Sequence, residues 1–207
     1  MDVQTVWHCN LRDIKVSTDS GQTWESTETP GHPDCKISFV DKDTGWVISS
    51  LQLRATADGG ATWNELDLPG GVAKVTAISL RTADEGYLMT SDGDLYRTQD
   101  GGKSWSSLPL DLAEYEDYAD MDLLPSNLPS AAIRFFDAEE GVVVVSLVGG
   151  GKSYVLALRT YDGGQTWDQE IIPVDIGVPY LSRDGKFLTI NSFLNSSTIL
   201  VAQYKGF

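Results

Sequence analysis

An eight-residue motif that occurs four times is the sequence feature that most constrains the fold. It has the form Ser/Thr-x-Asp-x-Gly-x-Ser/Thr-Trp and occupies residues 17–24, 56–63, 98–105 and 160–167. The aspartates of successive copies are 39, 42 and 62 residues apart, so the third interval carries an insertion. A nearly fixed period of this length is typical of repeat architectures, in which each copy is one supersecondary unit.

A second, weaker element lies between the motifs and consists of an apolar run, an acidic turn, a glycine and another apolar run. It occupies residues 38–46, 79–87 and 134–142, and a shortened copy surrounds Gly185. Short apolar runs bounded by Asp-Gly and Gly-Gly pairs are typical of strands in antiparallel hairpins. The pattern predicts four strands per repeat. In the second repeat we expect them at residues 36–40, 46–50, 51–56 and 62–66.

The motif contains the residue types that a tight turn between two strands requires. We expect its aspartate to accept hydrogen bonds from backbone N–H groups of its own turn, its glycine to supply a positive φ, and its tryptophan to begin the next strand. The predicted role of these residues is structural. They are Asp19, Gly21, Trp24, Asp58, Gly60, Trp63, Asp100, Gly102, Trp105, Asp162, Gly164 and Trp167.

The motif resembles the Asp box, or BNR repeat, of sialidase-like and sortilin-like propellers. The pairing of Phe39-x-Asp41-x-x-x-Gly45-Trp46 with Thr56-x-Asp58-Gly-Gly-x-Thr62-Trp63 most resembles the photosystem II stability and assembly factor family and its bacterial relatives. The resemblance covers nearly the whole chain and implies an all-β fold, a β-propeller of four-stranded antiparallel blades. It also implies an extracytoplasmic or secreted location, although residues 1–5 show no export signal.

Counting strands along the chain predicts a single domain of five blades. The first blade lacks an innermost strand and the last blade is also incomplete. The alternative is a piece of a longer propeller, but a seven-bladed ring needs roughly 280 residues, and the chain has 207. The expected blades are residues 1–29, 36–69, 74–109, 131–173 and 177–207.

Two insertions interrupt the repeat, near residues 111–122 and 149–153. The family geometry implies that both lie on the ligand face of the propeller. Loops on a rigid scaffold often carry binding specificity. The first is acidic and rich in tyrosine. Three alternatives fit it: a surface for a basic protein partner, a Ca2+ site made of carboxylate oxygens, or a solvated loop. The candidate partner-binding residues are Glu114, Tyr115, Glu116, Asp117, Tyr118, Asp120 and Asp122.

Arg134 is a further candidate for partner binding. In its repeat it takes the place that Ser38 and Ser79 have in theirs, on the strand expected to line the central channel. An arginine there can bind an anion or a carboxylate of a ligand, or it can pair structurally with one of the 30 acidic residues of the chain. Both alternatives remain open at the level of sequence.

The two histidines and two cysteines all fall within residues 8–35. Cys9 and Cys35 can form one disulfide that joins the first two blades, or they can be unpaired. Zinc is the third alternative, but His8-Cys9 and His32-Pro-Asp-Cys35 do not reproduce the spacing of a zinc site.

The charge of the chain excludes two classes of partner. A formal net charge of −15 repels nucleic acid and anionic lipid. The longest apolar run is far shorter than the 18 or so residues of a membrane span, so no membrane insertion is expected. No cofactor is expected either, and Ca2+ is the one metal that the acidic insertion suggests.

We expect a non-catalytic binding or assembly propeller that presents a site for a protein or other ligand. The alternative is a sialidase-like glycosidase or a carbohydrate-binding propeller, because both occur on this type of scaffold. The Phe/Tyr-Arg-Ile-Pro signature of sialidases is absent, and Ile133-Arg134-Phe135 does not match it. Carbohydrate binding would use Tyr115, Tyr118 or Tyr180 as exposed aromatic platforms.

Overall fold

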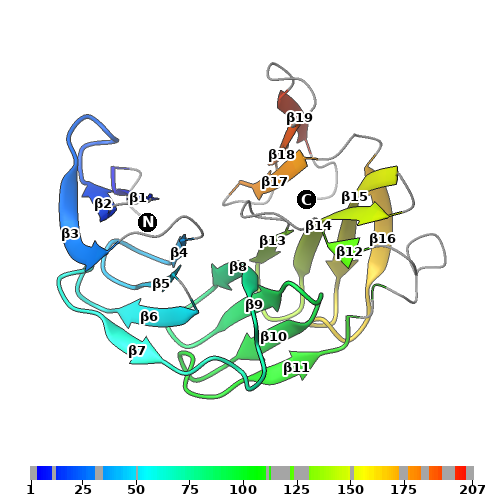
Figure 1. The fold of residues 1–207 in the computed structure, drawn as a ribbon, viewed down its shortest axis with the longest axis horizontal. Helices are drawn as coiled ribbons and strands as arrows, with labels where there is room; N and C mark the ends of the chain where they lie inside the picture. The colour runs from blue at the N-terminus through cyan, green and yellow to red at the C-terminus, as the bar shows by residue number, and fades with distance from the viewer. Residues whose placement is uncertain are drawn as a thin grey trace. The chain divides into compact units, whose positions relative to one another are not determined.

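The computed structural model describes residues 4–10, 13–30, 35–49, 51–110, 112, 122–123, 131–149, 152–172, 177–182, 187–192 and 199–203 (Figure 1). Regular structure within these residues is almost entirely β-strand, apart from 3-10 geometry at Leu112. The all-β class predicted from the sequence is confirmed.

Two sheets have the four antiparallel strands that the repeat predicts, each strand paired with its neighbour in the chain. The first of these sheets consists of β4 (Lys36–Phe39), β5 (Gly45–Ser49), β6 (Gln52–Thr56) and β7 (Asn64–Leu66). The second consists of β8 (Val75–Leu80), β9 (Gly86–Thr90), β10 (Leu95–Thr98) and β11 (Ser106–Leu108).

A third sheet has five strands because the acidic insertion adds one to it. Its strands are β12 (Asp122–Leu123), β13 (Ala131–Phe135), β14 (Gly141–Gly149), β15 (Lys152–Thr160) and β16 (Asp168–Ile172). Strand β14 pairs with β15 along its whole length and on its other side with both β12 and β13. The second insertion, near residues 149–153, therefore lengthens the β14–β15 hairpin.

Within the described ranges, the strands near each end of the chain form a three-stranded sheet. One sheet contains β1 (Val6–Cys9), β2 (Asp13–Ser17) and β3 (Glu25–Pro30), and the other contains β17 (Gly177–Leu181), β18 (Phe187–Ser192) and β19 (Ile199–Gln203). The register of β2 against β3 shifts between Asp13 and Lys15. The predicted number of five blades stays a prediction.

The chain divides into two compact units. The first comprises residues 1–73, 80–86 and 98–105. In this unit aromatic rings pack between successive repeats: Trp7 stacks on Phe39 with ring centroids 3.9 Å apart, and Trp46 lies 5.7 Å from Trp105. Strand β5 is buried along its whole length, which agrees with its apolar sequence Gly-Trp-Val-Ile-Ser.

The second unit comprises residues 74–79, 87–97 and 106–207. Its core also contains aromatic stacking between successive repeats, because Tyr87 stacks on Phe135 with ring centroids 3.7 Å apart. The valines of β14 alternate between two buried clusters, with Val143 and Val145 in the larger and Val142 and Val144 in the smaller. A strand buried on both faces explains why the sequence reads as a continuous apolar run there.

Candidate functional site

Each Asp box is a closed turn held by its own aspartate. In the fourth box, Asp162 Oδ1 accepts hydrogen bonds from the Thr160 hydroxyl (2.8 Å) and the Thr166 backbone N–H (2.9 Å), and Oδ2 accepts from the Thr166 hydroxyl (2.6 Å). The Thr160 hydroxyl oxygen accepts from the Gly164 N–H at 2.7 Å. The other boxes repeat this arrangement around Asp19, Asp58 and Asp100.

These hydrogen bonds favour the charged form of the carboxylates. The pKa of Asp19 is lowered to about 2, first by the backbone N–H and hydroxyl of Thr23. The pKa of Asp162 is also lowered to about 2, by the hydroxyl and the backbone N–H of Thr166. The pKa values of Asp58 and Asp100 are lowered for the same reason. Carboxylates ionised at neutral pH are poor general acids, so the box geometry fits a structural role.

The boxes are also fastened to the acidic turns that precede them. The first glycine of the box donates its N–H to a carbonyl of that turn, from Gly59 to Asp43 (2.9 Å) and from Gly101 to Asp84 (2.7 Å). In the fourth box Gly163 donates in the same way to Glu139 O at 2.8 Å. This bond explains why the two sequence elements recur together. Sequence reasoning found both elements but not the link between them.

The second glycine of the third and fourth boxes receives a leucine from the preceding repeat. A Cβ built at Gly102 lies 2.8 Å from Leu66 Cδ1, and one built at Gly164 lies 3.0 Å from Leu108 Cδ1. A side chain at either glycine would therefore displace the leucine side chain that lies against it. These leucines were missed in the sequence, although Leu66 and Leu108 both stand three residues after a box tryptophan.

The box tryptophans complete these contacts between repeats. Trp105 donates its indole N–H to Asp67 O at 2.9 Å, and Trp167 donates to Pro109 O at 3.0 Å. The accepting residue follows the leucine directly in each case. Trp24 differs, because its N–H donates to Gly21 O within its own box.

The acidic insertion is anchored at both ends by leucines of the second unit. Leu112 packs against the larger core cluster, and its Cδ1 lies 3.5 Å from a Cβ built at Gly93 in the β9–β10 turn. At the other end Leu123 is buried in β12, beside the exposed Asp122. The other candidate residues lie outside the described residues and stay predictions; they are Glu114, Tyr115, Glu116, Asp117, Tyr118 and Asp120.

Arg134 lies on β13, opposite Val142 of β14, and its side chain is half-buried. It takes part in an interaction with its surroundings and is not a free side chain. The corresponding residue of the second repeat, Ser38, accepts a hydrogen bond from the Leu80 N–H at 2.8 Å. Whether Arg134 binds an anion or pairs structurally stays a prediction.

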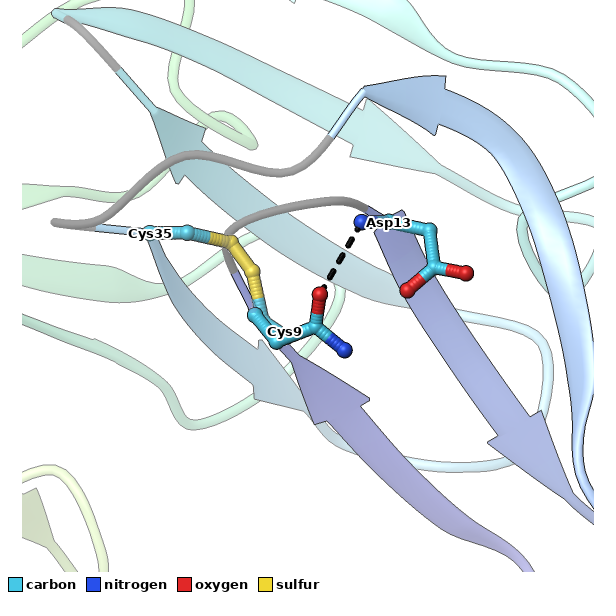
Figure 2. The surroundings of a disulfide bond; sticks show 4 residues. Cys9, Asp13 and Cys35 are labelled. Atoms are coloured by element: carbon cyan, nitrogen blue, oxygen red, sulfur yellow. Dashed lines mark hydrogen bonds between the residues drawn. A yellow bond between two sulfur atoms is a disulfide. The ribbon is translucent and has the colours of Figure 1, made fainter.

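A disulfide joins Cys9, at the end of β1, to Cys35, just before β4 (Figure 2). The two Cα atoms are 6.1 Å apart, within the range that a disulfide spans. In the same region the Asp13 backbone N–H donates to Asn10 Oδ1 at 3.1 Å and shapes the β1–β2 turn (Figure 2). Sulfurs joined in this way are not thiolates that could bind zinc.

Among the described residues, no group of three or more His, Cys, Asp and Glu side chains lies close enough together to hold a metal ion. No helix among those residues is long and apolar enough to cross a membrane. The Ca2+ alternative concerns the acidic insertion, most of which lies outside them, and is untested.

Comparison with known proteins gives one family match. The model of the family described as "Photosynthesis system II assembly factor YCF48" matches residues 15–114, a segment that contains the first three boxes. No curated protein matches the sequence.

Solved structures extend the likeness over the whole chain. "YCF48 from Cyanidioschyzon merolae" has 14% identity and a TM-score of 0.59, over 98% of this chain and 73% of that one. "YCF48 bound to D1 peptide" has 17% identity and a TM-score of 0.48, over 91% and 87%. The GH74 enzyme of Niastella koreensis has 12% identity and a TM-score of 0.64, but 97% of this chain covers only 34% of the enzyme.

At these identities the structural matches show the fold alone. Together with the four boxes and the antiparallel sheets, they show that the chain is a BNR-type β-propeller, as its sequence predicts. The family match shows that this propeller is related to the photosystem II assembly factors.

Proposed function

We propose that this chain is a non-catalytic propeller that binds a protein partner and takes part in assembling a larger complex. The observation that carries the proposal is the match of residues 15–114 to a family described as an assembly factor. The fold adds little support for this proposed function, because propellers of one architecture serve unrelated activities. The GH74 likeness concerns the fold alone, and no specific observation in the described residues favours glycoside hydrolysis.

We place the partner site on the acidic insertion and expect a basic partner. Two observations support this placement. Both ends of the insertion are held, by Leu112 packed against the core and by β12 paired with β14, which lowers the entropy lost when the insertion binds. The net charge of −15 also favours encounter with a basic surface.

We also propose that the protein works outside the cytoplasm. The disulfide between Cys9 and Cys35 supports this, because disulfides form and persist in oxidising compartments and are rare where thiols are kept reduced.

The test is a variant in which five acids of the insertion become amides: Glu114, Glu116, Asp117, Asp120 and Asp122. Immobilised wild-type protein should capture a partner from a native extract of the source cells, and the variant should lose most of that capture. Capture by the wild type should weaken steeply between 50 and 300 mM salt, because exposed charges are screened over about 10 Å at 0.1 M. Cross-linking with mass spectrometry should place the partner against residues 111–122.

The control has the same change in charge at exposed acids elsewhere: Glu25, Asp67, Asp84, Asp92 and Asp168. This control should retain capture. Retention by the insertion variant, or an equal loss in both variants, would show that the insertion is not the binding site.

A further inference from the structure

Five aspartates of the chain are followed directly by a glycine. They are Asp58, Asp92, Asp100, Asp162 and Asp184. In such a pair the backbone nitrogen of the glycine can reach the side-chain carboxyl carbon of the aspartate, because glycine carries no Cβ that hinders the approach. Asp184 lies outside the described residues. Three of the other four belong to Asp boxes and Asp92 does not, and the structure holds these two kinds of pair differently.

In the three boxes both groups of the pair are held by short hydrogen bonds. The aspartate Oδ2 accepts from a box hydroxyl at 2.6 Å in each of them. The glycine N–H donates to a carbonyl of the preceding acidic turn, at 2.9 Å from Gly59, 2.7 Å from Gly101 and 2.8 Å from Gly163. Attack of the glycine nitrogen on the carboxyl carbon would therefore break hydrogen bonds on both groups.

The box hydrogen bonds also keep the carboxyl groups in their charged form, which resists this attack. An amide nitrogen displaces water from a protonated carboxyl group far more readily than it attacks a carboxylate. The pKa of Asp162 is lowered to about 2 by the hydroxyl and the backbone N–H of Thr166, and the pKa values of Asp58 and Asp100 are lowered by bonds of the same kinds. At neutral pH the protonated form is therefore rarer in these aspartates than in an aspartate without such bonds.

Asp92 and Gly93 lie at the tip of the β9–β10 hairpin, where both groups are held more weakly. Within the described part of the chain, the exposed Asp92 carboxylate accepts one hydrogen bond, from the Ser91 hydroxyl at 3.3 Å. The Gly93 N–H donates to Thr90 O, also at 3.3 Å. Both distances are longer than the usual range for their type of hydrogen bond. The ends of the turn are fixed more firmly, since the Thr90 N–H donates to Asp94 O at 2.9 Å.

We propose that Asp92 is a site of spontaneous isomerisation to isoaspartate, and that the fold protects the aspartates of the three boxes from the same reaction. The Gly93 nitrogen attacks Asp92 Cγ. Its proton leaves with the carboxyl hydroxyl as one water molecule, and a five-membered succinimide ring forms. Water then adds to the main-chain carbonyl of the ring and opens it, so that the chain continues through the former side-chain carbonyl. One water is lost and one is gained, and no oxidant or other reactant is needed.

The reaction takes place within one dipeptide and needs only water, so it depends neither on a partner nor on the acidic insertion. Its product places one more carbon atom in the main chain of the β9–β10 turn. Gly93 of that turn has a φ of +92°, and Leu112 Cδ1 lies 3.5 Å from a Cβ built there. Isomerisation therefore alters the backbone against which the leucine at the start of the acidic insertion packs.

The test follows isoaspartate in the folded full chain during incubation at neutral pH and 37 °C over several weeks. Trypsin places the four described pairs on separate peptides, residues 55–74, 82–97, 98–103 and 160–183. Electron-transfer fragmentation in a mass spectrometer distinguishes isoaspartate from aspartate within each peptide. Isoaspartate should accumulate several-fold faster at Asp92 than at Asp58, Asp100 or Asp162.

Three comparisons separate the effect of the fold from that of the dipeptide sequence. In guanidinium chloride, where the box hydrogen bonds are lost, the four pairs should isomerise at similar rates. Ser104→Ala removes the hydroxyl that donates to Asp100 Oδ2 at 2.6 Å, and it should speed isomerisation at Asp100 several-fold without changing the rate at Asp92. Asp92→Glu would need a six-membered ring, which closes much more slowly, so it should remove the fast accumulation in residues 82–97 alone.

Several results would overturn the proposal. One is an Asp92 that stays unmodified in the folded chain but isomerises in guanidinium chloride, which would mean that the hairpin protects it as well. Another is an equal rate at Asp92 and at the box aspartates of the folded chain. A difference that persists in guanidinium chloride would assign the order of rates to local sequence. An unchanged rate at Asp100 in folded Ser104→Ala would contradict protection by the box hydrogen bonds.

Discussion

The aspartate of each box makes its stabilising contacts within eight residues. Asp100 shows the arrangement: Oδ1 accepts from the Thr98 hydroxyl at 2.7 Å and the Ser104 N–H at 2.9 Å, and Oδ2 accepts from the Ser104 hydroxyl at 2.6 Å. An asparagine cannot replace it without loss, because its amide nitrogen only donates. Such local hydrogen bonds are the part of the site that sequence reasoning predicts well.

The change Asp162→Asn should lower stability at neutral pH and flatten its dependence on pH. The pKa of Asp162 is about 2 in the folded protein, below its ordinary value near 4, so its contribution is present above about pH 4 and is lost as the pH falls towards 2. Urea unfolding between pH 2 and pH 7 measures this. The wild type should lose more stability than the variant between pH 4 and pH 2.

The control for this prediction is Asp168→Asn, at an exposed aspartate of β16 outside the box. Its curve of stability against pH should follow that of the wild type. If Asp162→Asn gave the same curve as this control, the box hydrogen bonds would not contribute to acid sensitivity.

The contacts between repeats were not predicted at the scale of residues, and the reason is distance along the chain. Leu66 meets Gly102, and Trp167 reaches the carbonyl of Pro109. Propensity and turn chemistry describe only neighbours in sequence, so they predicted the positive φ of the box glycines but not what lies against them.

At the scale of elements, strand positions followed from the repeat because each turn signal marks the end of a strand. Strands β4–β7 differ from the expected ranges by two residues or fewer at each end. The exceptions are β12 and the lengthened β14–β15 hairpin, where pairing continues from Gly141 opposite Thr160 to Gly149 opposite Lys152. The sequence indicated an insertion there but not how far the two strands pair, and the backbone groups of the inserted residues are satisfied by further hydrogen bonds between the strands.

The element-scale prediction concerns Gly102, which joins the third box to the preceding sheet. Its φ of +91° lies in the left-handed region, and a Cβ there would lie 2.8 Å from Leu66 Cδ1. Gly102→Ala should lower the free energy of unfolding by about 1–2 kcal/mol from the backbone alone, and displacement of Leu66 should add to this. Urea unfolding at pH 7 measures the loss.

Gly70→Ala is the matched control, because Gly70 has no positive φ and a built Cβ there meets no described atom within 4 Å. It should change the free energy of unfolding by less than about 0.5 kcal/mol. Equal losses in the two variants would mean that the leucine contact and the left-handed backbone at Gly102 do not matter for stability.

At the scale of the whole molecule, the periodic boxes sufficed to predict the propeller class, because every repeat carries the same information. The number of blades was harder to predict from the sequence, because the terminal repeats depart from the pattern. The first repeat has Val6 where others have Gly45 or Gly141, and Ser20 with φ +62° where the other boxes have glycine.

The disulfide between Cys9 and Cys35 should contribute measurably to stability. It closes a loop with a sequence separation of 26 residues, for which the chain-entropy estimate is about 3.5 kcal/mol. The double variant Cys9→Ser, Cys35→Ser should lose about this amount in urea unfolding without reductant. Dithiothreitol should lower the wild type to the level of the variant and leave the variant unchanged; a wild type that dithiothreitol does not affect would contradict this.

The same disulfide has a mechanical consequence for the first repeat. The first box, residues 17–24, lies wholly inside the covalent loop between Cys9 and Cys35. A force applied at the ends of the chain passes through the disulfide and bypasses the loop, so the fully stretched molecule is roughly 9 nm shorter than its reduced form. Tension on the oxidised protein therefore reaches the later repeats while the first box remains out of the line of force.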